Sequence, residues 1–330
     1  MDKVKVLIGG IEFENFEEMR IYSDLYSLGD TFSFAGVLAG KASPSQTSRN
    51  VRLGARCVIT INSKTVMNGY LTDSRLSVCP DRGTLLDLSG VDACGWVSEL
   101  TAAQFKEDDF TPVQAIAELR RQIPSLRNVA VSGLQGLPVM ESFTIETGET
   151  VSGVLDKIAN RYNRIFYANA NGQIVFGRKS RGGNFHNISI GKDKVKKATL
   201  AKSLQDVFDE LVFVCEDDGG FSEKEVFRVP FVPQTGKILH ARVAAASEEI
   251  REHAQKKVNE IIEKYMKLNL EYAGFTDNKG QVWEINKPAN ISDLTQTNLY
   301  SGTMVVESVE FSQTRNEKQT AKLTLTLPGV

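Results

Sequence analysis

Apolar and polar residues alternate in short runs over the first hundred positions. Residues 4–8 follow this pattern until Gly9-Gly10 ends the run, and residues 57–61 repeat it. Alternation with a period of two is typical of strands that bury one face, and the glycine, asparagine, aspartate and serine between the runs are common turn residues. Residues 1–100 therefore predict a small antiparallel β-barrel or a sandwich.

The pattern becomes helical between residues 101 and 190. Thr111-Pro112 predicts the start of one helix, because threonine can cap the first turn and proline suits the first helical position. A second helix is expected from Thr150, followed by strands at 164–168 and 173–177. This middle part of the chain is predicted to be a small inserted α+β domain.

Residues 191–330 return to a strand pattern and are expected to form a second β-barrel. An amphipathic helix is predicted at 247–268, with glutamate and lysine paired four residues apart on its polar side. The remaining expected strands are 207–215, 226–232, 268–272, 282–285, 303–311 and 318–327. The predicted fold class is α+β and mainly β, with two similar antiparallel barrels around an inserted domain.

Two hairpins near the ends of the chain resemble each other. Residues 72–90 and 306–329 each contain a strand, a polar turn and a second strand, and just upstream 68–73 resembles 273–277. Amphipathic hairpins can look alike by chance, which is one interpretation. The other is that the chain carries two copies of one barrel. Three such subunits would present six similar surfaces, which fits a sixfold partner.

Composition narrows the possible functions. The 330 residues are 41% hydrophobic and 24% charged, so a packed core is expected. With 39 basic and 41 acidic residues, the formal charge of −2 argues against nucleic-acid binding by bulk charge, although a local basic patch stays open. The lysines between 192 and 202 could face a phosphate backbone or only solvent. No apolar run approaches the ~18 residues of a membrane span or forms a signal-peptide core, so we expect no membrane insertion.

Residues with catalytic or metal-binding potential are sparse. His186, His240 and His253 lack metal-ligand spacing, and the sequence has neither a nucleophile elbow nor a phosphate-binding loop. Four cysteines without a C-x-x-C pair predict reduced core thiols in a protein made in a reducing cytoplasm. The sequence therefore predicts no enzyme activity, no metal and no cofactor.

One segment points to a different function. Residues 143–155 resemble the opening of LysM glycan-binding modules, although a strand is expected at 164–168 where LysM has a second helix. One hypothesis is accordingly a peptidoglycan-binding or muralytic protein. Another hypothesis, a protein that binds a host receptor or a carbohydrate, would need exposed aromatic platforms. Only Trp96 and Trp283 are present, each expected in a strand or at a strand end.

The order of the motifs resembles a known family over nearly the whole chain. The matching segments are 7–10, 29–34, 69–73, 88–92, 97–100, 143–162, 171–176, 242–265, 280–286 and 325–329. In this order they resemble the Mu-like phage tail protein P family, the late-control D-like hubs of contractile-tail baseplates. The chain departs from the family at 90–95, where a Gly-Arg-Ser/Asp stretch is common.

This resemblance implies a structural role in the virion. It implies a homotrimeric ring whose two barrels per subunit adapt the sixfold tail tube to the threefold central spike. Baseplate wedge proteins would be further partners, and DNA would pass through the axial channel without sequence-specific binding. The residues singled out as structural or interface candidates are Trp283, Asn286, Gly69, Tyr70 and Asp73.

Overall fold

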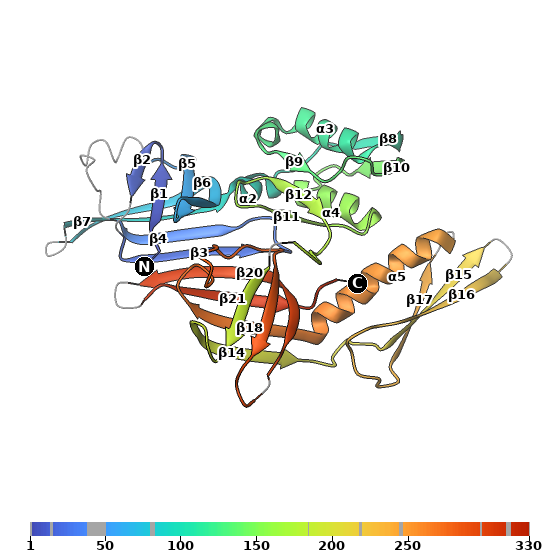
Figure 1. Ribbon diagram of the computed structural model, residues 1–330. Coiled ribbons are helices and arrows are strands. Elements are labelled where there is room, and N and C mark those ends of the chain that lie inside the picture. Colours follow the sequence, from blue (N-terminus) through green and yellow to red (C-terminus); the bar gives the residue numbers. More distant parts are fainter. Residues whose placement is uncertain are drawn as a thin grey trace.

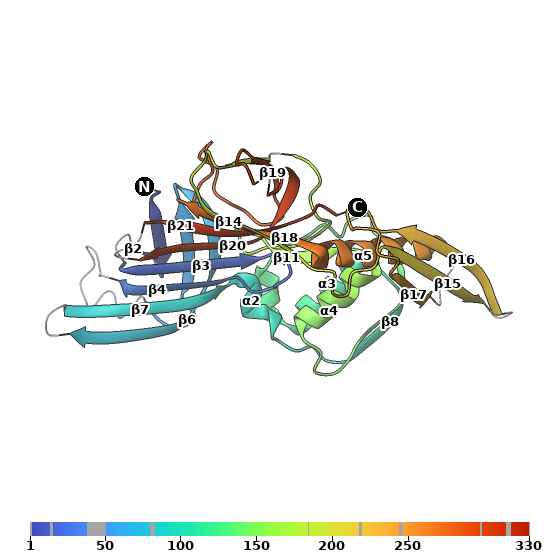
Figure 2. The ribbon, with the colours of Figure 1, turned by 90° about the horizontal axis from the view of Figure 1, so that it is seen from below.

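The computed structural model describes residues 2–13, 16–37, 51–79, 83–183, 185–217, 220–243, 247–297, 299–314 and 318–329. A long curled sheet of 13 strands forms most of the molecule, and a small α+β part lies beside it (Figure 1). The N-terminal strands lie at one end of the molecule. A helix and a three-stranded sheet extend from the other end (Figure 2). The predicted fold class, mainly β with an α+β insertion, is confirmed.

The long sheet contains strands from both ends of the chain. The N-terminal strands are β1 (Val4–Ile8), β2 (Ile11–Phe13), β3 (Glu18–Asp24), β4 (Thr31–Val37), β5 (Arg56–Ile61), β6 (Lys64–Cys79) and β7 (Gly83–Asp92). The C-terminal strands are β13 (His186–Ile190), β14 (Val195–Lys202), β18 (Met266–Ala273), β19 (Pro288–Asp293), β20 (Gly302–Thr314) and β21 (Thr320–Thr326).

These strands form two sets with the same topology, which we call the first and second repeats. The order in the first repeat is β3-β4-β7-β6-β5-β1, and in the second it is β14-β18-β21-β20-β19-β13. The corresponding strands also follow one another in the same order along the sequence in both repeats. The one difference is that β1 runs antiparallel to β5, whereas β13 runs parallel to β19.

The long hairpins of the two repeats also match in detail. In each, one residue of the first strand bulges out of the ladder: Thr72 in β6 and Glu307 in β20. Leu71 opposite Gly90 therefore corresponds to Val306 opposite Leu325. The predicted likeness of the two hairpins is confirmed. The upstream segments are not equivalent in the fold, because 68–73 lies in β6 whereas 273–277 begins at the last residue of β18, the equivalent of β4.

One junction joins the repeats into a continuous sheet. Strand β3 pairs antiparallel with β20, from Asp24 opposite Ser308 to Glu18 opposite Thr314. At its centre Ile21 lies opposite Phe311, and both side chains are buried in a hydrophobic core that draws on both repeats. The two β units are therefore packed as one body.

The insertion between β7 and β13 has its own hydrophobic core. Its elements are α2 (Ala93–Ser98), β8 (Phe105–Phe110), α3 (Pro112–Gln122), a 3₁₀ turn (Pro124–Asn128), β9 (Val131–Ser132), β10 (Met140–Ile145), α4 (Val151–Arg161), β11 (Ile165–Ala168) and β12 (Ile174–Gly177). The predicted helix starts are confirmed, since Thr111 and Thr150 each accept a first-turn N–H. The prediction that Trp96 lies in a strand or at a strand end is wrong, because Trp96 lies in α2, which begins where Asp92 accepts the Gly95 N–H.

A second insertion lies between β14 and β18. It comprises β15 (Glu210–Asp217), β16 (Gly220–Arg228), β17 (Ile238–Val243) and α5 (Ser247–Tyr265). The helix is shorter than the predicted 247–268, because Met266 begins β18, which pairs with both β14 and β21. No strand forms at 282–285; only Val282 bridges, to Thr276.

Replacement of Trp283 by alanine tests how this core is packed. The indole is 1% exposed and lies against His186 and Tyr272, with ring centroids 4.6 and 5.0 Å away. We expect Trp283→Ala to lower the free energy of unfolding by about 3–5 kcal/mol, because a large cavity is left. Denaturant melts measure this. Trp96→Ala is the control, since that ring is 41% exposed, and a loss at Trp283 no greater than at Trp96 would contradict the assignment.

Candidate functional site: the polar face of the long sheet

The two faces of the long sheet differ sharply in chemistry. In β3, Met19 and Ile21 are buried while Glu18 and Arg20 are exposed, and β4, β18 and β21 follow the same alternation. Because side chains alternate across a strand, one face carries the core and the other is left to polar residues. We call this second side the polar face.

Small neutral and charged side chains make up the polar face. Shallow depressions on it are lined by Arg20, Ser33, Asp73, Asp87, Ser89, Thr199, Asn269, Glu271, Glu310, Ser312, Lys322 and Thr324. These residues come from both repeats, so the surface crosses the junction between β3 and β20 without interruption.

Several charges on the polar face are paired. Arg20 donates to Glu310 through Nη2 at 2.5 Å and Nε at 3.0 Å, and Lys322 donates to the other carboxylate oxygen at 3.1 Å. Burial opposes ionisation of Glu310, but the hydrogen bonds from Lys322 and Arg20 hold its pKa below the usual value. Lys267 pairs with Glu307 at 2.6 Å. These pairs contain one more cation than carboxylate, and Asp73, Asp87 and Glu271 add negative charge to the same face.

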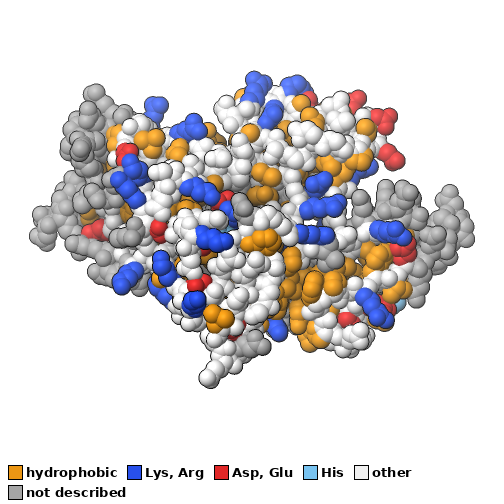
Figure 3. Space-filling model, viewed as in Figure 1, with side chains coloured by type: hydrophobic (Ala, Val, Ile, Leu, Met, Phe, Trp, Pro, Cys, Tyr) orange, Lys and Arg blue, Asp and Glu red, His pale blue; other side chains and the backbone are white. Residues whose placement is uncertain are grey.

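Basic residues elsewhere on the visible surface are scattered. Figure 3 shows Lys and Arg side chains spread among neutral and acidic groups, without one continuous basic field. The described part of the face in this view therefore lacks the concentrated positive charge that holds a nucleic-acid backbone.

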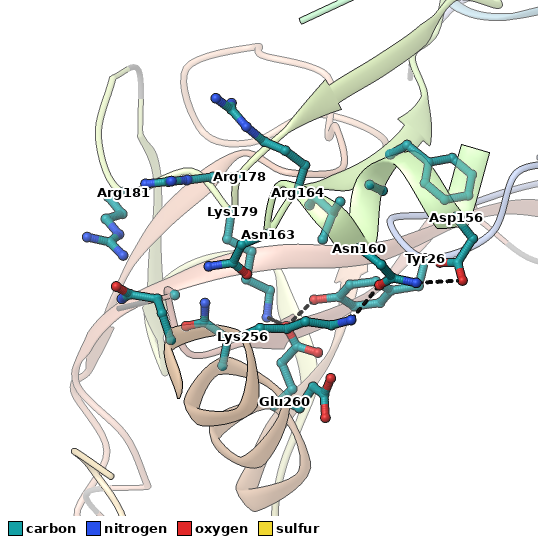
Figure 4. Close-up of a pocket in the computed structure, with 17 residues that line it drawn as sticks. Tyr26, Asp156, Asn160, Asn163, Arg164, Arg178, Lys179, Arg181, Lys256 and Glu260 are labelled. Carbon is teal, nitrogen blue, oxygen red and sulfur yellow. Dashed lines mark hydrogen bonds and ion pairs between the residues drawn. The ribbon is translucent and has the colours of Figure 1, made fainter. Parts of the chain in front are cut away.

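A pocket lies where the first insertion meets α5, beside Gly329 near the C-terminus (Figure 4). Inside it the Lys179 ammonium contacts Glu263 at 2.8 Å and Thr326 at 3.0 Å, and lies 5.6 Å from the centre of the Tyr26 ring. The Tyr26 hydroxyl donates to Glu263 as well. Burial lowers the pKa of Lys179, and Glu263 opposes that shift. This cluster fastens the first repeat, the insertion, α5 and β21 together.

The five interface candidates from the sequence lie in different places. Trp283 is in the core. Asn286 accepts the Ser180 N–H at 2.9 Å and donates to the Arg178 carbonyl at 3.2 Å, so it links the second repeat to the insertion.

The other three candidates lie along β6. A Cβ on Gly69 would meet the Val91 carbonyl oxygen at 2.0 Å, so only glycine fits there. Tyr70 packs on Trp96 with ring centroids 5.2 Å apart, and Asp73 lines the polar face. The structure does not bring the five together, and their role in an interface stays a prediction.

Sequence reasoning missed a buried pair of carboxyl groups, Asp30 and Asp92. Both are nearly inaccessible, and the Asp92 N–H donates to the Asp30 carbonyl at 2.9 Å. Burial, followed by the charge of Asp92, raises the pKa of Asp30 well above its usual value, and burial raises that of Asp92 to about 6. The only signal was their place in the segments 29–34 and 88–92, where they read as turn residues.

The described residues contain no group of three or more His, Cys, Asp or Glu arranged to hold a metal ion. Among the helices described, none combines the length and apolar character that a bilayer crossing needs.

The N-terminal part of the chain matches a known protein family. Residues 3–92 match the family described as "Mu phage baseplate assembly protein GpP-like, N-terminal". Over these residues the chain is similar to the N-terminal part of the GpP-like baseplate assembly proteins, and the resemblance expected from the sequence is confirmed. No curated protein sequence matches the chain.

Solved structures share the fold along the whole chain. The tail protein from Neisseria meningitidis MC58 is 20% identical with a TM-score of 0.78, covering 98% of this chain and 96% of that one. The 43 kDa tail protein of prophage MuSo2 from Shewanella oneidensis is 18% identical with a TM-score of 0.77, covering 99% and 98%. The E. coli c3393 protein, a type VI secretion component described as similar to T4 gp27 and gp5, is 9% identical with a TM-score of 0.63, covering 98% and 77%.

Lys179→Met tests the fastening role of the pocket cluster. It keeps most of the buried aliphatic chain but removes the charge that faces Glu263, and we expect a loss of about 2–4 kcal/mol in unfolding free energy. Lys257→Met is the control. Lys257 forms an exposed ion pair with Glu260 on α5, the helix that carries Glu263, and this pair should contribute under about 1 kcal/mol to the free energy of unfolding. Equal losses in urea melts would contradict the role of Lys179.

Asp30→Asn tests the buried carboxyl pair through pH. A pKa raised in the folded state means that the pair favours folding at low pH and that this contribution is lost as pH rises through the folded pKa. The wild type should therefore lose stability as the pH rises from about 4, the usual carboxyl pKa, through the raised folded pKa values, and Asp30→Asn should reduce that loss by about 1–3 kcal/mol. The exposed-site variant Asp108→Asn is the control, and parallel pH profiles for wild type and Asp30→Asn would refute the pairing.

Proposed function

We propose that the chain is a structural hub of a phage tail baseplate. Three copies form a ring whose six β repeats meet a sixfold tail tube on one side and a threefold central spike on the other. The observation that carries this proposal is the identical strand order of the two repeats, because a ring of three chains with two equivalent units each presents near-sixfold symmetry.

In this proposal the polar face lines the axial channel. Each phosphate contact adds affinity for DNA and slows its transit, so a useful wall offers hydration without a net basic charge. The acidic side chains of Asp73, Asp87 and Glu271 on this face offset the basic ones, which supports that role. Tail tube, spike and baseplate wedge proteins are the proposed partners, and the virion is the proposed location.

We also retain a three-part division of the chain in this proposal. The two β parts, 1–100 and 191–330, supply the strands of the ring together with β13, and the part at 101–190 projects from the ring with α2 packed in its core. The separate hydrophobic core of the first insertion supports this division.

The mass and symmetry of the purified full chain test the hub. A trimer should have a mass of about 110 kDa, three times the chain mass of 36.4 kDa. Light scattering across a concentration series gives the mass, and negative-stain class averages give the rotational symmetry. A protein that stays monomeric at high concentration would overturn the proposal, as would rings of any symmetry other than threefold.

A further inference from the structure

The two repeats leave two complementary strand edges open at opposite ends of the sheet. β14 pairs with β18 on one side and, in the part of the chain that the structure describes, with nothing on the other. β6 pairs with β5 only as far as Tyr70, so its second half, from Asp73 to Cys79, is bonded by described strands only through β7. Open edges of this kind are sites for strand addition.

The junction inside the chain shows what each open edge fits. By the matched strand order, β14 is the equivalent of β3, and β6 is the equivalent of β20. Within the chain β3 and β20 pair with each other. The open edge of β14 is thus equivalent to the edge of β3 that pairs with β20. The second half of β6 is equivalent to the part of β20 that pairs with β3.

The register of such a contact follows from the ladders. Phe32 lies opposite Ile21 in the first repeat as Leu268 lies opposite Leu200 in the second, so Ile21 and Leu200 are equivalent. The shared bulge makes Leu76 the equivalent of Phe311. Because Ile21 lies opposite Phe311, Leu200 of one copy would lie opposite Leu76 of the next.

The exposure of these side chains agrees with a missing neighbour. Phe311 is 3% exposed, whereas Leu76, on the same side of the equivalent strand, is 65% exposed. Leu200 is only partly covered by the core. Leu76 is exposed at a position where the other repeat buries a phenylalanine. Burial of this leucine against a second copy of the chain would therefore stabilise the contact between the two copies.

We propose that β14 of one copy adds antiparallel to the second half of β6 in the next copy, with Leu200 opposite Leu76. This inference rests on the proposed ring and assigns its subunit contact. The contact is head to tail, so every copy uses both edges, and equal junctions within and between chains close a ring of six repeats. The exposed Lys196, Lys197 and Lys202 on β14 discourage indiscriminate pairing of a free edge.

Cysteine pairs in the full chain test the register. Directly opposed residues in an antiparallel pair have Cβ atoms close enough for a disulfide. In a background with Cys79 and Cys215 replaced by serine, we expect oxidised L76C/L200C to run as a covalent trimer on a non-reducing gel. The matched pair R75C/L200C is offset by one residue, which places the two thiols on opposite faces of the sheet, and should stay uncrosslinked.

A charge substitution gives an independent readout. Leu76→Lys should leave folding intact, since the side chain is exposed, and should raise the concentration for half-dissociation of the trimer about tenfold or more. Leu294→Lys is the control, at a leucine that is 61% exposed outside both edges. A trimer without the L76C/L200C crosslink, or with equal crosslinking of the offset pair, overturns the register and leaves the ring standing. The absence of any trimer overturns both.

Discussion

Backbone pairing between β3 and β20 is the interaction on which the architecture depends. The N–H and C=O groups along a strand edge need partners, and an unpaired edge recruits whatever strand can reach it. Here the first repeat supplies that partner to the second repeat, and Ile21 and Phe311 bury a shared core at the same point. The chain therefore makes one sheet and one core out of two similar units.

The strand period then divides the chemistry of the sheet. Alternation places the apolar residues of both repeats in the core and leaves serine, threonine, asparagine and charged residues on the other side. Since the repeats join edge to edge, their polar sides merge into one surface. Glu310 pairs with Arg20 and Lys322 on that surface, and nearby acidic side chains offset the remaining positive charge.

The insertions modify this plan without interrupting it. One enters between the repeats and the other between β14 and β18, so each leaves from a strand end and the ladders stay intact. Lys179, with Glu263, Tyr26 and Thr326, fastens both insertions to the sheet. A rigid attachment of this kind suits a protein whose proposed work is mechanical.

Local chemistry let the sequence determine many elements. The hairpin of β6 and β7, that of β20 and β21, and the starts of α3 and α4 follow from alternation and from capping by Thr111 and Thr150, which act within a few residues. The same local patterns carried the family resemblance. They failed for α2, a single short helix fixed by the Asp92 cap, and for 282–285, where Trp283 packs as a buried loop residue.

Only the tertiary structure decided the contacts between distant segments. Ile21 and Phe311 are far apart in sequence, and no local pattern says which of several equally amphipathic strands will pair. The same holds for Asp30 with Asp92, which read as turn residues until the fold buried both, and for the side of each strand that became the polar face. The alternation of apolar and polar residues determines that a strand has two different faces. Only assembly of the sheet determines which neighbours each face contacts.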